Sequence, residues 1–148
     1  MNAVITGASR GIGKAVAEIF ASHGYDLYLC SQNEERLLET AEALKTAFPN
    51  ISIEAQAFDL AKKQQARLFG EWVLNNTDSI DVLVNNVGTF IQGNVSDEPD
   101  GALEKMLEVN LFSAYHTTRA LLPKMITDKN GHIFTICSIA SLHAYPNG

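Results

Sequence analysis

The chain has 148 residues, of which 46% are hydrophobic and 19% charged, and its formal net charge is −6. This length suits one domain, and these fractions are typical of globular proteins rather than disordered or fibrous ones. Acidic and basic residues are scattered, so no basic patch for nucleic acid or anionic lipid is predicted. No apolar stretch approaches the roughly 20 residues that cross a bilayer, and the amino terminus does not resemble a signal peptide. We therefore expect one cytoplasmic domain without nucleic-acid or membrane partners.

Short β-branched runs alternate along the chain with segments of helical period. The predicted strands lie at 2–6, 26–30, 51–58, 80–84 and 132–137, and the predicted helices at 12–23, 34–47, 61–75 and 102–126. Alternating strands and helices with nearly continuous apolar strands predict a parallel sheet covered on both faces. The expected fold class is therefore α/β, a Rossmann-type doubly wound parallel sheet, as a single domain over 1–148. Its ligands bind outside the carboxyl ends of the strands.

The cysteines and histidines give no sign of a metal site or a disulfide. Cys30 and Cys137 each lie in an apolar, strand-like run without a C-x-x-C pair, which predicts two buried, reduced thiols. His23, His116 and His132 are isolated from other ligand types, so no metal is expected.

The strongest motif is "TGASRGIG", residues 6–13, between the first predicted strand and the first predicted helix. Gly7 permits a sharp exit turn, Gly11 lets the backbone approach a pyrophosphate, and Gly13 allows close packing of helix on strand. The helix amino terminus offers free N–H groups and a positive dipole end to phosphate. A purely structural turn is the alternative, but this context favours nucleotide binding.

This spacing resembles the cofactor fingerprint of the classical short-chain dehydrogenases/reductases, and four later stretches match the same family in order, over residues 6–138. The matching stretches are Asp59 in "FDL", "NNVG" from Asn85 to Gly88 with Val87 in place of alanine, Asn110 in "VNLF", and Ser138 at the end of the fifth strand. The resemblance implies a catalytic site that includes Ser138 and Asn110. It implies cofactor contacts from Gly7, Ser9, Arg10, Gly11, Ile12, Gly13, Asp59, Leu60, Asn86, Val87 and Gly88.

Several of these residues also have a structural interpretation. The carboxylate of Asp59 can accept a hydrogen bond from an adenine amine, or it can cap a helix. Asn86 and Gly88 border the cofactor path, or form a plain turn. Asn110 lies on the apolar stripe of its helix, where an unpartnered amide would cost roughly 1–3 kcal/mol. It is expected to hold a water that relays protons to the catalytic lysine, as in the family, or to tie neighbouring backbone together.

Ser138 is not expected to be a nucleophile, because "ICSIA" lacks Gly-x-Ser-x-Gly and no acid follows His143. In the family this serine donates a hydrogen bond to the substrate carbonyl, while a tyrosine whose pKa is lowered by a lysine exchanges the proton. Tyr145 comes too early for that tyrosine and precedes Pro146, which disfavours a helix. The Tyr-x-x-x-Lys pair is expected beyond Gly148, with the carboxyl-terminal part of the fold missing and the chain alone inactive.

The cofactor preference depends on the end of the second strand. This strand runs into "CSQNEER", which has Ser31 and Gln32 at the turn and no acid until Glu34. An acid there would accept from the 2′-hydroxyl of NAD, whereas Arg10 can bind the 2′-phosphate of NADP. NADP is therefore favoured and NAD is possible. "NEER" itself has the pattern of a solvated helix face.

The predicted function is that of an oxidoreductase which transfers hydride between NADP(H) and a small carbonyl or alcohol substrate, as a dimer or tetramer by family resemblance. The alternative is a nucleotide-binding module or truncated pseudoenzyme that binds NAD(P) without turnover. A nucleotide-sugar epimerase is disfavoured, because such enzymes usually carry Gly-x-x-Gly-x-x-Gly after the first strand.

Overall fold

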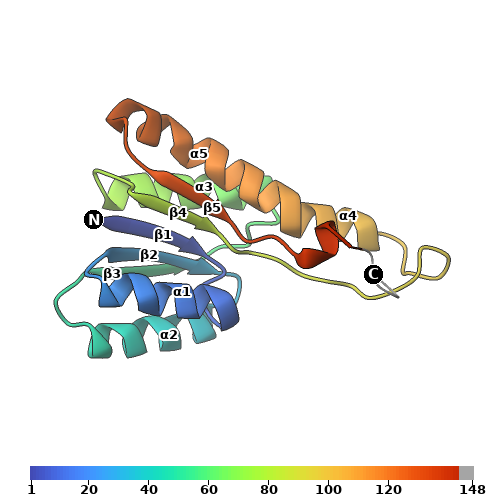
Figure 1. The fold of residues 1–148 in the computed structure, drawn as a ribbon, viewed down its shortest axis with the longest axis horizontal. Helices are drawn as coiled ribbons and strands as arrows, with labels where there is room; N and C mark the ends of the chain where they lie inside the picture. The colour runs from blue at the N-terminus through green and yellow to red at the C-terminus, as the bar shows by residue number, and fades with distance from the viewer. Residues whose placement is uncertain (144–148) are drawn as a thin grey trace.

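The structure, a computed structural model, describes residues 1–143 and contains one parallel sheet in the strand order β3-β2-β1-β4-β5. All strand pairs are parallel, so their carboxyl ends lie at the same edge of the sheet (Figure 1). This confirms the predicted α/β fold. The strands are β1 (Asn2–Thr6), β2 (Asp26–Ser31), β3 (Ile53–Ala57), β4 (Val82–Asn85) and β5 (His132–Thr135).

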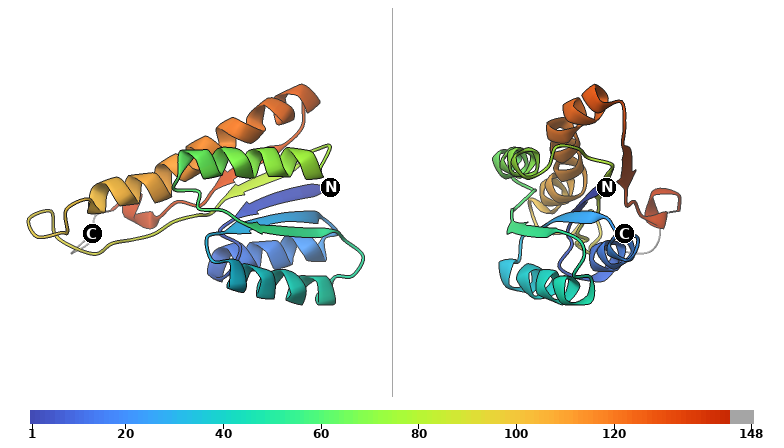
Figure 2. Two further views of the ribbon diagram at one scale, coloured as in Figure 1. Left: turned by 180° about the vertical axis from the view of Figure 1, so that it is seen from behind. Right: turned by 90° about the vertical axis from the view of Figure 1, so that its left-hand side faces the viewer.

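Helices cover both faces of the sheet, as the doubly wound prediction requires. Figure 2 shows α1 and α2 on one side of the strands and α3 and α5 on the other. The segment that follows β4 and the helix α4 extend past the carboxyl ends of the strands (Figure 1). The helices are α1 (Gly11–Ser22), α2 (Glu34–Ala47), α3 (Lys63–Asn76), α4 (Ala102–Leu107), a π-helical turn η1 (Glu108–Phe112), α5 (Ser113–Asp128) and a 3-10 turn η2 (Ile139–Ser141).

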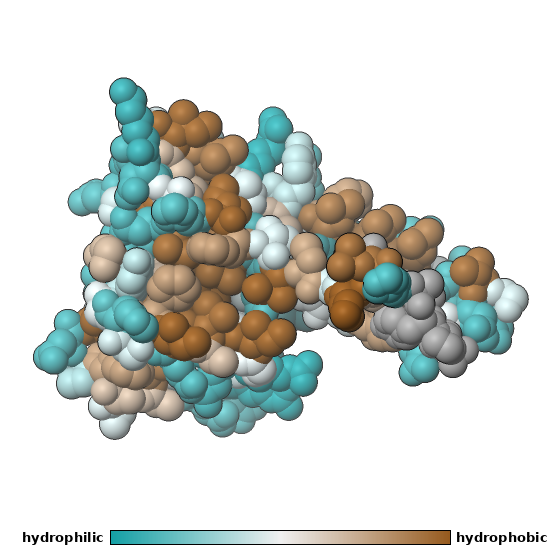
Figure 3. Space-filling model, in the orientation of Figure 1, coloured by the Kyte–Doolittle hydropathy of each residue, from teal (hydrophilic) through white to brown (hydrophobic). Residues whose placement is uncertain are grey.

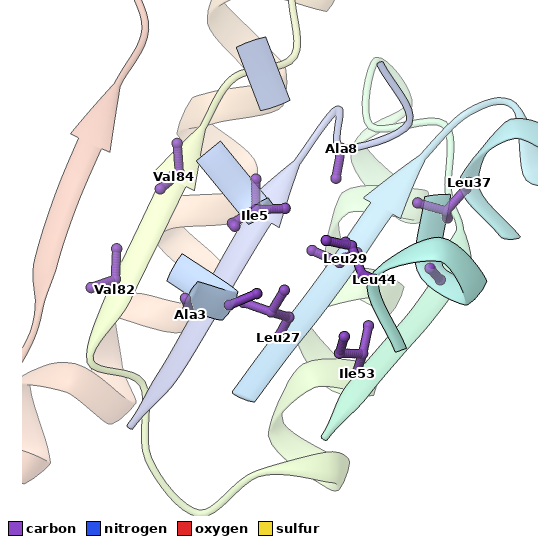
Figure 4. Close-up of a cluster of buried hydrophobic side chains, with 13 residues drawn as sticks. Ala3, Ile5, Ala8, Leu27, Leu29, Leu37, Leu44, Ile53, Val82 and Val84 are labelled. Atoms are coloured by element: carbon purple, nitrogen blue, oxygen red, sulfur yellow. The ribbon is translucent and has the colours of Figure 1, made fainter. Parts of the chain in front are cut away.

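Alternate residues of each inner strand enter two separate apolar cores, because successive side chains of a strand point to opposite faces. In β1, Ala3 and Ile5 pack under α1 and α2 (Figure 4). Val4 faces the core under α3 and α5. In β2, Leu29 joins the first core and Tyr28 the second. Both faces of the central strands are therefore buried, which fixes their register.

The long helix predicted at 102–126 is interrupted. The structure divides it into α4, the π-helical turn η1 and α5, with Asn110 in the middle of η1. A π turn accommodates one extra residue and displaces the side chains around it, and such turns are frequent at functional sites. The predicted apolar stripe is therefore broken where the polar residue stands.

The prediction that Cys137 is buried is wrong, whereas Cys30 is buried as expected. Strand β5 is the last in the order of the described strands, and all its residues are exposed. Among the nearby apolar side chains, Phe134 remains 51% exposed and Ile136 42% exposed. Figure 3 shows apolar surface on the side of the molecule where β5 runs. An apolar run marks a strand, but it cannot distinguish a central strand from an edge strand.

The thiol of Cys30 is expected to resist iodoacetamide at about pH 8 in the native chain, because burial raises its pKa, while Cys137 reacts. The folded state disfavours the Cys30 thiolate. The contribution of the buried thiol to the free energy of unfolding is therefore present below about pH 8.5 and is lost as the pH rises further. Mass spectrometry of the labelled peptides measures both reactions, and denatured chain is the control in which both thiols react. Rapid native labelling of Cys30 would contradict its burial.

Gly70→Ala is expected to lower the free energy of unfolding by about 1–3 kcal/mol. The reason is that the new Cβ would lie 2.5 Å from Cβ of Ala120, at the contact of α3 with α5. The sign is diagnostic, since Gly→Ala inside a helix otherwise stabilises by up to about 1 kcal/mol. Urea unfolding measures the change, and the double variant Gly70→Ala, Ala120→Gly should recover part of the loss. A stabilised Gly70→Ala chain would show that α3 and α5 are further apart.

Candidate functional site

The candidate site lies at the carboxyl ends of β1 and β4, where the winding of the sheet reverses. The chain passes from β1 to β2 and β3 on one side and then returns to β4 on the other side of β1. Ligands of open parallel sheets bind in the crevice that this reversal leaves. A cleft of about 780 Å³ opens there. Its lining residues are Gly7, Ser9, Arg10, Gly11, Ser31, Gln32, Asn33, Arg36, Asn86, Val87, Gly88, Thr89, Lys105 and Val109.

The hydroxyl group of Thr6 joins the ends of β1 and β4. It donates to the carbonyl of Val84 at 3.2 Å and accepts from the backbone N–H of Asn86 at 2.9 Å. The side-chain amide of Asn86 in turn donates to the carbonyls of Thr6 (3.1 Å) and Gly7 (3.2 Å). Asn86 thus links the two strand ends by hydrogen bonds and is more than a plain turn residue. Gly88 follows it at the edge of the cleft.

The glycine-rich turn has the conformation that its sequence predicts. Gly7 has a φ of +66° and Gly11 a φ of +55°, which glycine adopts without strain. A Cβ on Gly13 would overlap the carbonyl oxygen of Gly7 and lie 2.5 Å from Nδ2 of Asn86. A Cβ on Gly11 would meet nothing within 4 Å, so the space above this residue is open to a ligand.

The helix that follows the turn leaves its amino terminus to a ligand. The cap residue of α1, Arg10, makes no side-chain cap hydrogen bond, and the first turn contains no acid. The first N–H groups of a helix have no partner within the helix, and together they present a positive dipole end. A phosphate group fits this arrangement, since it accepts hydrogen bonds and carries negative charge.

Hydrogen bonds also attach the turn to β2 and α2. The hydroxyl groups of Ser9 and Ser31 lie 2.8 Å apart, and the hydroxyl of Thr40 in α2 donates to the carbonyl of Ser9 at 3.1 Å. At the start of α2, Oδ1 of Asn33 accepts from the backbone N–H of Arg36 at 2.8 Å. The turn, the end of β2 and the start of α2 therefore form one connected wall of the cleft.

The amide of Asn110 ties the loop after β4 to the helix. Its Oδ1 accepts from the backbone N–H of Thr89 at 2.7 Å, and its Nδ2 donates to the carbonyl of the same residue at 2.9 Å. Asn110 is exposed rather than buried on an apolar stripe, because the π turn displaces it toward the loop. The expected structural tie is present, and it holds a lining residue of the cleft.

Four residues assigned to the cofactor do not line this cleft, namely Ile12, Gly13, Asp59 and Leu60. Ile12 is 59% exposed in the first turn of α1, and Leu60 is 3% exposed within the core under α3. Asp59 does not cap α3, whose cap position is Lys62. Oδ1 of Asp59 accepts from the N–H of Ala61 at 3.3 Å, and Oδ2 of Asp59 lies 3.3 Å from Nζ of Lys62. Their roles toward a cofactor remain predictions.

Ser138 lies three residues beyond the end of β5 rather than at its last position. Its Oγ accepts from the backbone N–H of Ala140 at 3.1 Å, and the residue caps the short turn η2. The strand pairing extends as far as Ile136, whose N–H donates to the carbonyl of Asn85 at 2.9 Å. Ser138 therefore stands on the same edge of the sheet as the cleft. Tyr145 lies outside the described residues.

Several lining residues of the cleft are not predicted from the sequence. "NEER" is not wholly a solvated face, since Asn33 and Arg36 line the cleft. Lys105 and Val109 approach from the opposite side, on α4 and η1. The sequence position of Arg36 could have indicated a site residue, because Arg36 stands in the first turn of a helix directly after the carboxyl end of a central strand.

Residues 1–143 contain no group of three or more His, Cys, Asp or Glu side chains that could hold a metal ion. Within the same residues, no helix has the length and apolar character needed to span a membrane.

A glycine-rich turn before an uncapped helix, at the reversal point of a parallel sheet, defines a nucleotide-binding protein of the Rossmann type. The sequence model of the short chain dehydrogenase family matches residues 1–148, so the chain belongs to this family. It is 33% identical over 138 residues to an uncharacterized oxidoreductase of Staphylococcus saprophyticus, covering 93% of the chain and 58% of the relative.

Two solved structures have the same fold. The alcohol dehydrogenase of Thermococcus sibiricus, complexed with 5-hydroxy-NADP, has a TM-score of 0.94 at 31% identity, over 99% of this chain and 62% of that one. L-sorbose reductase of Gluconobacter frateurii, complexed with NADPH and L-sorbose, has a TM-score of 0.92 at 32% identity, over 97% of this chain and 54% of that one. The chain spans about half the length of the curated relatives it matches, 58% and 46% in two cases.

Asn110→Ala is expected to expose the backbone N–H of Thr89 and to raise its hydrogen-exchange rate by roughly 2- to 10-fold, the equivalent of one ordinary hydrogen bond. Asn110→Asp is the matched control, because it keeps the acceptor and should retain most of the protection. Amide exchange followed by nuclear magnetic resonance measures both variants. Equal exchange in Asn110→Ala and the unmodified chain would show that Asn110 does not hold the loop.

Proposed function

We propose that this chain binds NADP(H) in the cleft at the carboxyl ends of β1 and β4. We further propose that the whole protein transfers hydride between NADP(H) and a small carbonyl or alcohol substrate. The observation that carries the proposal is the pairing of the open Gly11 turn with the uncapped amino terminus of α1. Together they offer unshared N–H groups to a pyrophosphate. The family and the NADP-bound neighbours support this assignment.

The preference for NADP over NAD is supported by charge. Gln32 directly follows β2, and no carboxylate lines the cleft among the described residues. NAD would be favoured by an acid that accepts from its 2′-hydroxyl, whereas Arg10 can donate to a 2′-phosphate. NADP is therefore the proposed cofactor, with NAD as the weaker ligand.

The nicotinamide supplies the hydride chemistry when it is bound. The chain contributes binding and orientation. Asn86 holds the strand ends together, and Asn110 holds Thr89 at the cleft. For Ser138 we propose a hydrogen bond from Oγ to the substrate carbonyl, which would stabilise the charge that develops on its oxygen. The general acid, a tyrosine followed four residues later by a lysine, is proposed to lie beyond residue 148.

The alternative is a nucleotide-binding module without turnover. Both functions share the cleft, so they differ only in whether a positioned acid is present. Loss of such an acid typically costs about 10²–10⁴ in rate. We also propose, by family resemblance alone, a cytoplasmic location and a dimer or tetramer.

The purified chain is expected to bind NADPH and to show negligible carbonyl reduction, at least about 10²-fold below a chain with a positioned acid. NADPH fluorescence measures binding, and loss of NADPH absorbance with a panel of aldehydes and ketones measures turnover. Gly13→Ala is the control and should bind NADPH more weakly, since its Cβ would overlap the carbonyl of Gly7 and distort the turn. Its circular dichroism shows whether the variant folds. Failure of the unmodified chain to bind either NADPH or NADH would contradict the proposal, and turnover would show that an acid is already present.

A further inference from the structure

Two arginines stand on one wall of the cleft and come from different elements. Arg10 belongs to the glycine-rich turn and Arg36 to the first turn of α2. The charged residues that line the cleft are these two and Lys105, all of them cations, although the chain has 17 acidic and 11 basic residues. Among the described residues, neither arginine forms a salt bridge. The wall is therefore electropositive in an acidic protein.

Hydrogen bonds fix the backbone of Arg36 relative to the turn that carries Arg10. The side chain of Asn33 accepts from the N–H of Arg36, which sets the start of the helix. One turn further along α2, Thr40 donates to the carbonyl of Ser9, the residue before Arg10. The Ser9 hydroxyl also meets that of Ser31 at the end of β2. Little backbone freedom has to be lost for both guanidinium groups to approach one ligand.

The two acids beside Arg36 in sequence do not oppose this role. Glu34 and Glu35 occupy the first turn of α2, yet neither lines the cleft. At the end of β2, Gln32 offers an uncharged amide. The wall thus presents cations and neutral groups to whatever enters beside β2.

Resting on the proposed binding of the dinucleotide, we infer that Arg36 is a second specificity-determining cation, which pairs with Arg10 on the 2′-phosphate of NADP. A phosphate monoester carries about −1.5 to −2 charges near neutral pH and offers three acceptor oxygens. A planar guanidinium donates two parallel hydrogen bonds to such a group, so two arginines can hold it from two directions. NAD has only a hydroxyl at this position, and it gains nothing from the second cation.

Lys105 lies elsewhere in the cleft, so its substitution can distinguish specific recognition of the 2′-phosphate from general attraction of a negatively charged dinucleotide. It lies on α4, which follows β4, whereas Arg36 lies on α2, which follows β2. Since β2 and β4 flank β1 on opposite sides, the two cations stand on opposite walls. A general electrostatic effect would act on both dinucleotides from either wall, in proportion to their charge.

The test is calorimetric titration of the chain with NADP⁺ and, separately, with NAD⁺. Arg36→Gln is expected to weaken NADP⁺ binding by about 10- to 100-fold, the loss of a charge-assisted contact, and to change NAD⁺ binding little. Arg36→Lys should retain part of the preference. Lys45→Gln, near the far end of the same helix, removes the same charge and should leave both affinities unchanged. Lys105→Gln should lower the ratio of NADP⁺ to NAD⁺ affinity much less than Arg36→Gln does, because Lys105 stands on the opposite wall.

The binding of NAD⁺ by Arg36→Gln also shows that the variant is folded. A ratio of NADP⁺ to NAD⁺ affinity that is unchanged in Arg36→Gln would overturn the inference and leave the proposed function standing. An equal fall of this ratio in Arg36→Gln and Lys105→Gln would overturn it as well, because the attraction would then be unspecific. If the unmodified chain binds neither dinucleotide, the proposed function fails and the inference fails with it.

Discussion

The cleft depends on the hydrogen bonds between Thr6 and Asn86. These residues are 80 positions apart, and they meet only because β4 returns to the side of β1 opposite to β2. Thr6 is 1% exposed, so its hydroxyl would be costly to bury without partners, by roughly 1–3 kcal/mol. It has partners on both sides, Val84 and Asn86, and it therefore fixes the gap between the strand ends. A Cβ on Gly13 would lie 2.5 Å from Nδ2 of Asn86, so the start of α1 packs close to the same two strand ends.

The sequence predicted those parts of the structure that local pattern determines. The range predicted for the second helix, 34–47, is the range of α2, and the turn glycines have the conformations that their spacing implies. What it did not predict depends on contacts between distant segments. Asn110 finds its partners on the backbone of Thr89, in a loop without regular pattern, and a π turn moves it there. Cys137 follows an apolar run that predicts a strand equally well at the centre or at the edge of a sheet.

The first turn of α2 shows the same limit. Periodicity correctly assigned a helix to "NEER", and charged residues are normally solvated. Which of these residues faces the cleft is decided by the rotation of the helix about its axis, and the bond from Thr40 to Ser9 sets that rotation. The sequence shows which residues of α2 share a face, but it does not show which segment of the chain that face contacts. Arg36 therefore became visible as a site residue only with the fold.

The amino termini of α1 and α2 have different roles at the cleft. In α2, Asn33 caps the helix, and Glu34 and Glu35 satisfy its dipole from within the chain. In α1 no side chain caps the helix and no acid stands in the first turn, so its positive end is left to a ligand. The capped helix can hold a cation at its start, because its own acids offset the charge. The uncapped helix must take an anion from outside, and both helices point at the same cleft.

The two halves of the proposed reaction depend on different stretches of the chain. The cleft is assembled from residues between β1 and η1, and its strand ends are held by hydrogen bonds within that range. Ser138 lies past β5, and a separate hollow of about 640 Å³ is lined by residues of α5 together with Leu111, Asn85 and Thr135. In this hollow, Oδ1 of Asn85 is buried without a hydrogen-bond partner among the described residues. In the proposed reaction, nucleotide binding is thus assigned to one stretch of the described chain, and the contact of Ser138 with the substrate to another.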